Sequence, residues 1–152
     1  MRYDKFSVLI LVVSVVSFSC ESPTSTSGAN LLFYPTKAAY HIDESSAHPL
    51  LITTFIINSY PDTVEFLIEC WDWQSVQVFQ DSTWVDAFPE TWNIDCADRT
   101  LTLLPFKNTN IGFALWPDFP FSSGLYRFAI WYHRSGESGW SELYSAGFTL
   151  TR

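Results

Sequence analysis

Residues 124–134 read GLYRFAIWYHR, and the alternation of side chains along this stretch decides the fold class. Arg127, Trp131 and His133 fall on one face of an extended chain, and aromatic or aliphatic residues occupy the other face. Those on the apolar face are Tyr126, Phe128, Ile130 and Tyr132. A period of two with one apolar face is typical of a β-strand that packs against a core. The stretch therefore predicts a half-buried strand.

The same period recurs on both sides of this stretch, in short segments separated by Pro, Gly, Asn, Asp and Ser. In TVEFLIEC, for example, Val64 and Phe66 share one face while Glu65 and Glu69 share the other. The residues QDST at 80–83 are typical of a hairpin connection. We predict strands at residues 30–35, 50–58, 63–70, 75–80, 83–87, 100–104, 110–116, 125–134 and 142–151. No segment carries a convincing helical stripe.

These short strands, each apolar on one face, determine how the sheets must be arranged. A single open sheet would leave its apolar face in water, whereas two sheets packed face to face remove that exposure. We therefore expect an all-β domain over residues 30–152, a sandwich of about seven to nine strands.

The motif at Gly124, Leu125 and Tyr126 resembles the tyrosine corner of immunoglobulin-like Greek-key domains, in which a Gly-x-Tyr sequence enters a late strand. The resemblance implies that the Tyr126 hydroxyl bonds to the backbone a few residues upstream. The wider order of features is similar to immunoglobulin-like domains of bacterial secreted and lipid-anchored proteins. The features are Tyr40, Asn58, the segment VQVFQDSTWVDA, Pro105 and the terminal GFTLTR. The likeness implies an immunoglobulin-like Greek-key β-sandwich, a fold that serves spacers, adhesion modules and inhibitors alike.

The N-terminus has the order of an export signal. Arg2 and Lys5 precede an apolar run at 6–16, and small residues lead into Cys20. A run of about eleven residues is too short for a helix that crosses a bilayer. The stretch resembles the lipobox of bacterial lipoproteins, and the resemblance implies a lipid on Cys20, which becomes the first residue of the mature chain. Ordinary secretion and an uncleaved anchor are the alternatives.

The leader suggests a division of the chain into three parts. They are a lipoprotein signal peptide at 1–19, a lipidated cysteine with a flexible linker at 20–29, and the sandwich domain at 30–152. The linker contains too few apolar residues to fold. We expect a bacterial cell-envelope protein that is attached to the outer membrane through Cys20, on its periplasmic or its exposed side.

Charge and cysteine content narrow the possible partners. The chain carries 16 Asp and Glu against 8 Lys and Arg, a net charge of −8, which repels phosphate backbones and disfavours nucleic acid. If Cys20 carries lipid, Cys70 and Cys96 remain, and two cysteines in an oxidising compartment normally pair. Two free buried thiols are the alternative. Neither cysteine lies in a CxxC motif, so redox catalysis and zinc binding lack support.

Aromatic residues are the one compositional excess, with seven Trp, seven Tyr and thirteen Phe. Trp71, Trp73, Trp84 and Trp92 lie close in sequence to the two cysteines, in predicted loops and a hairpin. Exposed Trp rings can stack on sugars or anchor a protein partner. We predict these four as the ligand-binding residues, and the alternative is that they fill the core.

No pattern of catalytic residues stands out. The acids near the cysteines are Glu69, Asp72, Glu90, Asp95 and Asp98, and they lack the spacing of a calcium loop. His41, His48 and His133 lack metal-site spacing, and no GxSxG, phosphate-loop or dinucleotide motif occurs. We expect no catalytic residue, cofactor or metal. The sequence favours a non-catalytic binding or structural module whose partner is an envelope protein or a glycan. The alternatives are a carbohydrate-binding or adhesion domain and an inhibitor of an extracellular hydrolase.

Overall fold

The computed structural model describes residues 30–68, 76–87 and 99–152, and these residues form strands and connecting turns without a helix. The strands are β1 (Leu31–Pro35), β2 (Ala39–His41), β3 (Leu50–Asn58), β4 (Val64–Ile68), β5 (Val76–Gln80), β6 (Thr83–Asp86), β7 (Arg99–Leu103), β8 (Asn108–Leu115), β9 (Gly124–Arg134), β10 (Ser141–Tyr144) and β11 (Phe148–Thr151). Among the described residues there is no helix with the length and hydropathy of a membrane span. The prediction of an all-β domain is confirmed.

Several predictions fall on residues that the structure does not describe. The signal peptide at 1–19, the linker at 20–29 with Cys20, and the disulfide between Cys70 and Cys96 all lie outside the described residues. They stay predictions.

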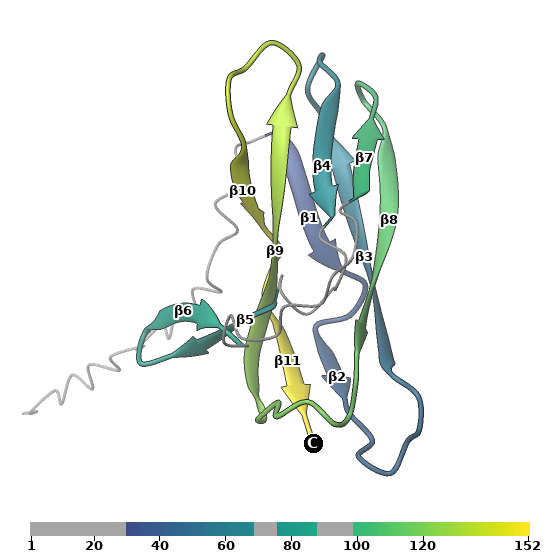
Figure 1. Cartoon of the computed structure of the whole chain (residues 1–152), viewed down its shortest axis with the longest axis vertical. Helices are drawn as coiled ribbons and strands as arrows, with labels where there is room; N and C mark the ends of the chain where they lie inside the picture. The colour runs from purple at the N-terminus through teal and green to yellow at the C-terminus, as the bar shows by residue number, and fades with distance from the viewer. Residues whose placement is uncertain (1–29, 69–75, 88–98) are drawn as a thin grey trace, which may run out of the picture.

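The strands form two sheets (Figure 1). One has the order β1-β3-β8, and the other has the order β2-β11-β9-β4-β7, with β10 and β5 also paired to β9 and β6 paired to β5. Phe113 on β8 stacks on Phe128 on β9 with 3.9 Å between ring centroids, so the inner faces of the two sheets meet. The arrangement is consistent with a β-sandwich, because each sheet buries its apolar face against the other.

Strand β9 is the centre of the larger sheet. Its first half pairs with β11 and β5, and its second half pairs with β10 and β4. Tyr126, Phe128 and Ile130 are buried, whereas Trp131 is exposed, which confirms the predicted alternation. The middle of this strand therefore separates a core face from an outer face.

The predicted strand at 142–151 is wrong as one element, because it divides into β10 and β11. At the division the Ser145 hydroxyl accepts a hydrogen bond from the Phe128 N–H, and the Ala146 N–H donates to the Phe33 carbonyl of the other sheet. The chain thus crosses toward β1 before it rejoins β9. Strand β2, which the alternation of side chains did not predict, is three residues long and runs parallel to β11.

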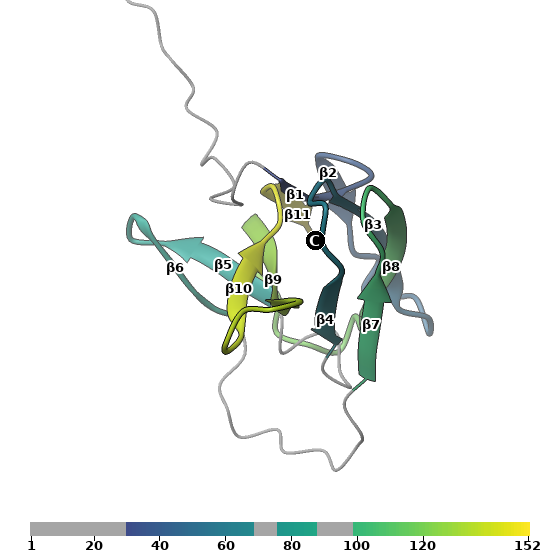
Figure 2. The same cartoon turned by 90° about the horizontal axis from the view of Figure 1, so that it is seen from above.

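Strands β5 and β6 form the hairpin predicted from QDST. Asp81 and Ser82 have φ values of 48° and 67°, the left-handed pair that a two-residue type I′ turn requires. Figure 2 shows the hairpin extending away from the two layers of strands. Its base is attached to β9 through Val76, Gln77 and Val78.

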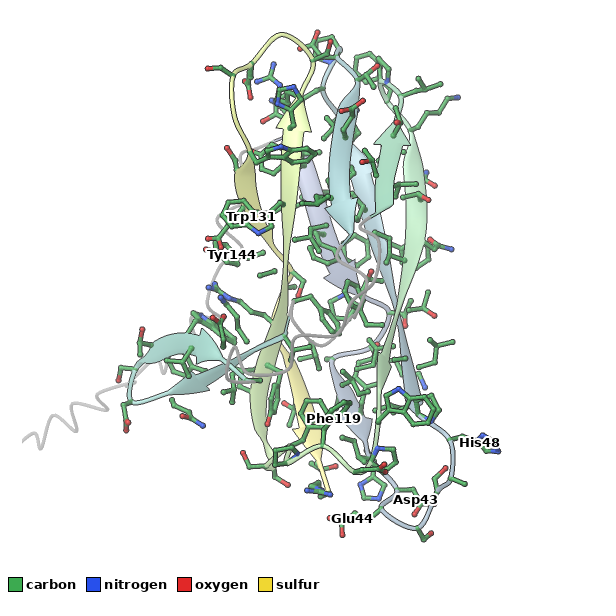
Figure 3. All side chains as sticks on the ribbon, in the orientation of Figure 1. Asp43, Glu44, His48, Phe119, Trp131 and Tyr144 are labelled. Atoms are coloured by element: carbon green, nitrogen blue, oxygen red, sulfur yellow. The ribbon has the colours of Figure 1, made fainter. Side chains whose placement is uncertain are left out.

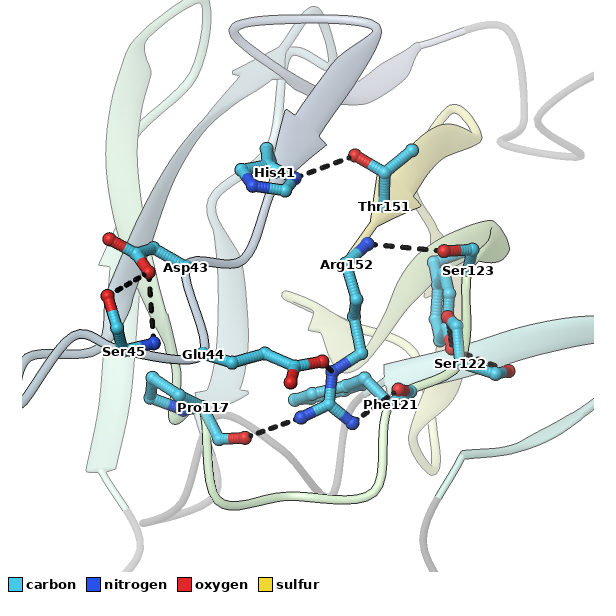
Figure 4. A network of polar contacts seen from close by, with 11 residues as sticks. His41, Asp43, Glu44, Ser45, Pro117, Phe121, Ser122, Ser123, Thr151 and Arg152 are labelled. Atoms are coloured by element: carbon cyan, nitrogen blue, oxygen red, sulfur yellow. Dashed lines mark hydrogen bonds and ion pairs between the residues drawn. The ribbon is translucent and has the colours of Figure 1, made fainter.

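A network of polar contacts joins the loops at the end of the domain where the chain ends (Figure 4). The Arg152 guanidinium donates to the carbonyl of Pro117 at 3.0 Å and to that of Phe121 at 2.9 Å, and it pairs with Glu44 at 2.7 Å. In the same loop as Glu44, the hydroxyl and N–H of Ser45 donate to Asp43 and lower the pKa of that carboxyl. These contacts connect the β2–β3 loop to the segment between β8 and β9.

The Tyr126 hydroxyl donates to the carbonyl of Ser122 at 2.7 Å, which confirms the hydrogen bond that the GLY motif implied. Replacing Tyr126 with Phe removes this bond while keeping the buried ring. We expect the free energy of unfolding to fall by about 1 kcal/mol, because the Ser122 carbonyl loses its hydrogen bond from the Tyr126 hydroxyl. Urea denaturation followed by circular dichroism measures the change. Tyr34→Phe, at an exposed ring, is the control, and an equal loss there would contradict the role of Tyr126.

Candidate binding face

Of the four tryptophans predicted as ligand-binding residues, the structure describes one. Trp71, Trp73 and Trp92 lie outside the described residues, and Trp84 is described on β6. The Trp84 ring is half-buried and packs against Phe79, with 5.2 Å between centroids. It is therefore a partly covered ring near the turn of the hairpin rather than a freely exposed platform.

The outer face of the larger sheet carries a group of aromatic and polar side chains from β6, β9, β10 and the segment before β10. We call this group the aromatic face, and its members are Trp84, Arg127, Trp131, His133, Trp140, Glu142 and Tyr144. Figure 3 shows Trp131 and Tyr144 on the β9–β10 side of the domain. The register places Trp131 between Glu142 on β10 and Leu67 on β4.

Trp131 and Trp140 are the exposed rings of this face, at 39% and 43%. Trp131 is exposed because the alternation of β9 directs it away from the core. Trp140 lies just before β10, where Glu142 and Tyr144 continue the same alternation. Two large apolar rings on one sheet face are available to a ligand.

Arg127 lies in the part of the aromatic face that is beside the β5–β6 hairpin. Its guanidinium is 3.8 Å from the centroid of the Tyr144 ring and 4.5 Å from that of the Trp84 ring. Its Nε donates to Gln77 at 2.8 Å, and Gln77 in turn donates to Asp86 at 3.1 Å. Burial lowers the pKa of Arg127 while the nearby Tyr144 and Glu142 raise it. The two cation–π contacts hold the hairpin against β9 and β10.

Glu142 and Tyr144 form a hydrogen-bonded pair on β10. The Tyr144 hydroxyl donates to the Glu142 carboxylate, and this bond, together with burial, raises the pKa of Tyr144 above its usual value. Glu142 is exposed beside Trp131. A carboxylate oxygen is thus positioned next to an exposed ring, where it can accept a hydrogen bond from a ligand hydroxyl.

His133 lies in the part of the aromatic face that is beside the β9–β10 loop. Its Nδ1 is 2.9 Å from the Gly139 carbonyl, and because a carbonyl only accepts, Nδ1 carries the proton. The His133 ring contacts the Trp140 ring, with 5.6 Å between centroids. Glu65 on β4 lies opposite His133. The imidazole therefore holds the β9–β10 loop and supports one of the two exposed rings.

The chemistry available on this face is stacking and hydrogen bonding. Within residues 30–68, 76–87 and 99–152, no three His, Cys, Asp or Glu side chains gather as a group that could hold a metal ion. The acids discussed for calcium lie outside these ranges, and they are Glu69, Asp72, Glu90, Asp95 and Asp98.

The alternation along β9 predicted the outward positions of Trp131 and Arg127, but no local pattern predicted the cluster that Arg127 forms with Glu142 and Tyr144. The one available signal was the alternation of Trp140, Glu142 and Tyr144. That signal shows which residues share a face, but it says nothing of which strand lies beside them. No protein-family model and no curated protein matches this chain.

Proposed function

We propose that this protein is a lipid-anchored, non-catalytic binding module of the bacterial cell envelope, and that it binds a carbohydrate through the aromatic face. The observation that carries the proposal is the exposure of Trp131 and Trp140 on one sheet face, with the Glu142 carboxylate beside Trp131. Sugar rings present C–H groups that pack on aromatic rings and hydroxyls that bond to carboxylates. Stacking and hydrogen bonding are both available here.

The charges of the face favour a neutral sugar. Glu65, Asp86 and Glu142 contribute negative charge, and Arg127 is already engaged by two rings and by Gln77. The whole chain has a net charge of −8. A uronic acid or a sulfated sugar would meet repulsion without a free guanidinium to bind it. We therefore propose that neutral or amino sugars bind more tightly than acidic ones.

The anchoring and the fold family belong to the same proposal. The order of residues 1–20 supports a lipid on Cys20. An immunoglobulin-like Greek key is supported by the pairing of β1 with β3, by the parallel pairing of β2 with β11, and by the bond from Tyr126 to Ser122. In this proposal the domain is a rigid support for the aromatic face.

Two tryptophan variants test the carbohydrate site. Trp131→Ala and Trp140→Ala are expected to weaken glycan binding by roughly fivefold or more each, because truncating a central aromatic contact costs over about 1 kcal/mol. Isothermal titration calorimetry with neutral, amino and acidic oligosaccharides of bacterial envelopes measures the affinities. Trp116→Ala is the matched control, because Trp116 is also 39% exposed but follows β8 of the other sheet.

Unchanged glycan affinity in folded Trp131→Ala and Trp140→Ala chains would contradict the proposed carbohydrate site. Equal losses in these two and in Trp116→Ala would point to a general effect on the fold. Tighter binding of acidic than of neutral glycans would contradict the charge argument.

The β5–β6 hairpin supports a second candidate, an inhibitor of an extracellular hydrolase. The hairpin extends from the sheets and exposes Phe79 and Val85 (Figure 2). An inhibitory hairpin would lose its effect on a target hydrolase in Phe79→Asp and keep it in Trp131→Ala. The opposite pattern, with glycan binding lost only in Trp131→Ala, favours the carbohydrate module.

A further inference from the structure

The turn that joins β7 to β8, residues 104–107, exposes two large apolar side chains. Leu104 is 57% exposed and Phe106 is 70% exposed. Leu32 on β1, at the same end of the neighbouring sheet, is also exposed. Its partner in register is Ile57, which in turn lies opposite Asn108, just after the turn. Leu32 thus adds an exposed apolar side chain on the sheet, two strands away from Asn108.

The backbone at Phe106 is unfavourable for the residue that it carries. Its φ of 55° lies in the left-handed region, where a glycine or an asparagine is accommodated far more easily than a bulky aromatic residue. A strained, exposed and apolar residue contributes little to the stability of the fold. Such residues persist where function requires the side chain.

This turn lies at the end of the domain where the described chain begins. The Ser59 N–H donates to the Asn30 carbonyl at 2.7 Å. The preceding residue, Asn58, donates through its side chain to the Leu104 carbonyl at 3.1 Å and through its N–H to the Lys107 carbonyl at 2.9 Å. Figure 1 shows the β3–β4, β7–β8 and β9–β10 turns together at the end opposite the C-terminus. Asn30 and the apolar turn are thus parts of one rigid unit.

The charged groups of the three turns are balanced, although the whole chain is acidic. Arg134, at the end of β9, pairs with Asp62 at 2.9 Å and with Glu137 at 2.7 Å. Lys107 is the remaining charged residue of these turns. An anionic surface would repel most of this protein but would meet no net negative charge here.

We infer that Leu104 and Phe106 insert into the interfacial region of the lipid bilayer to which the chain is attached. The inference rests on the proposed lipid on Cys20, which is ten positions before Asn30. Ten residues span at most about 35 Å, so the anchor keeps this end near the bilayer. The other end lies farther away by the length of β9, whose 11 residues span about 36 Å. Apolar side chains next to Lys107 are typical of an interfacial contact.

A fluorescent label next to the turn tests the contact. The full chain, purified from membranes with its lipid, is reconstituted into vesicles of phosphatidylethanolamine and phosphatidylglycerol. An environment-sensitive dye is attached through Asn108→Cys, which leaves Leu104, Phe106 and Lys107 intact. Ala47→Cys, exposed in the β2–β3 loop, is the control, and the chain without an added cysteine gives the background. Acyl-brominated lipids are expected to quench the label at 108 several-fold more than the label at 47.

A second variant separates contact from folding. Phe106→Gly in the Asn108→Cys chain is expected to reduce quenching to the level seen at 47. It is also expected to raise the denaturation midpoint, because glycine adopts the φ of this position without strain. Quenching at 108 no greater than at 47, or unaffected by Phe106→Gly, would overturn the inference. So would shielding of the label without vesicles as the protein concentration rises, since the turn would then contact a second copy.

The mass of the N-terminal peptide tests the anchor independently. A peptide without lipid on Cys20 would contradict the anchored function that we propose. In that case quenching at 108 by added vesicles still supports the contact, and its absence overturns it.

Discussion

Asn58→Asp is expected to reduce the free energy of unfolding at neutral pH by about 3 to 5 kcal/mol, because it leaves an uncompensated buried charge. Asn58 is fully buried, and its amide nitrogen donates to the carbonyls of Asp62, Leu103 and Leu104. Its amide oxygen accepts from the Tyr60 N–H. Carbonyls only accept, so the side chain is held in one orientation. A carboxylate in this place would have an oxygen facing three other oxygens.

The same variant should depend on pH in a definite direction. Burial and the facing carbonyls raise the pKa of the new carboxyl in the folded chain above its unfolded value. The folded state then binds the proton more tightly, so the stability lost at neutral pH is recovered in part as the pH falls through the folded pKa and toward the unfolded one. Guanidinium denaturation at a series of pH values measures this relative to the parent chain.

Asn110→Asp makes the identical chemical change at an exposed position of β8 and is the matched control. We expect it to change stability by less than about 0.5 kcal/mol. A similar loss in both variants, or a loss at Asn58 that does not vary with pH, would show that the buried network is not the cause.

Phe128→Ala is the second variant with a large expected effect, a loss of about 3 to 5 kcal/mol. Phe128 is fully buried and stacks on Phe113 at 3.9 Å and on Phe148 at 4.8 Å between ring centroids. Phe113 belongs to the smaller sheet, and Phe128 and Phe148 belong to the larger one. Truncation therefore leaves a cavity between the sheets and removes one of the contacts that join them.

Phe79→Ala is the control for Phe128→Ala, because the Phe79 ring is 39% exposed on the β5–β6 hairpin. Chemical denaturation of the two variants should give a much larger loss for Phe128. Phe128→Leu, which fills part of the cavity, should fall between the parent chain and Phe128→Ala. Comparable losses at Phe79 and Phe128 would contradict the central place of the stacked rings.

The positions of these residues separate stability from binding. The even-numbered residues of β9 from Tyr126 to Ile130 are in the core, while Trp131 and Arg127 lie on the outer face. Truncation of Trp131 should therefore change affinity at little cost in stability, and truncation of Phe128 should do the reverse. The division follows from the two-residue period of a strand.

Local sequence determined most of the strands of this protein and which of their residues face inward. The alternation in GLYRFAIWYHR predicted β9, QDST predicted the hairpin turn, and the Gly-x-Tyr motif predicted the bond from Tyr126. Each of these depends on neighbours within a few residues, where backbone geometry and side-chain period are decisive.

Tertiary structure alone decided which strands meet. The pairing of β10 with β9 brings Glu142 beside Trp131 and Tyr144 over Arg127, and the crossing at Ser145 divides a run that reads as one strand. The composition of the aromatic face and the closeness of Asn30 to Leu104 likewise depend on partners far away in the chain. A strand presents the same edge to any partner, so register is selected by the packing of the whole core, and no short stretch of sequence contains it.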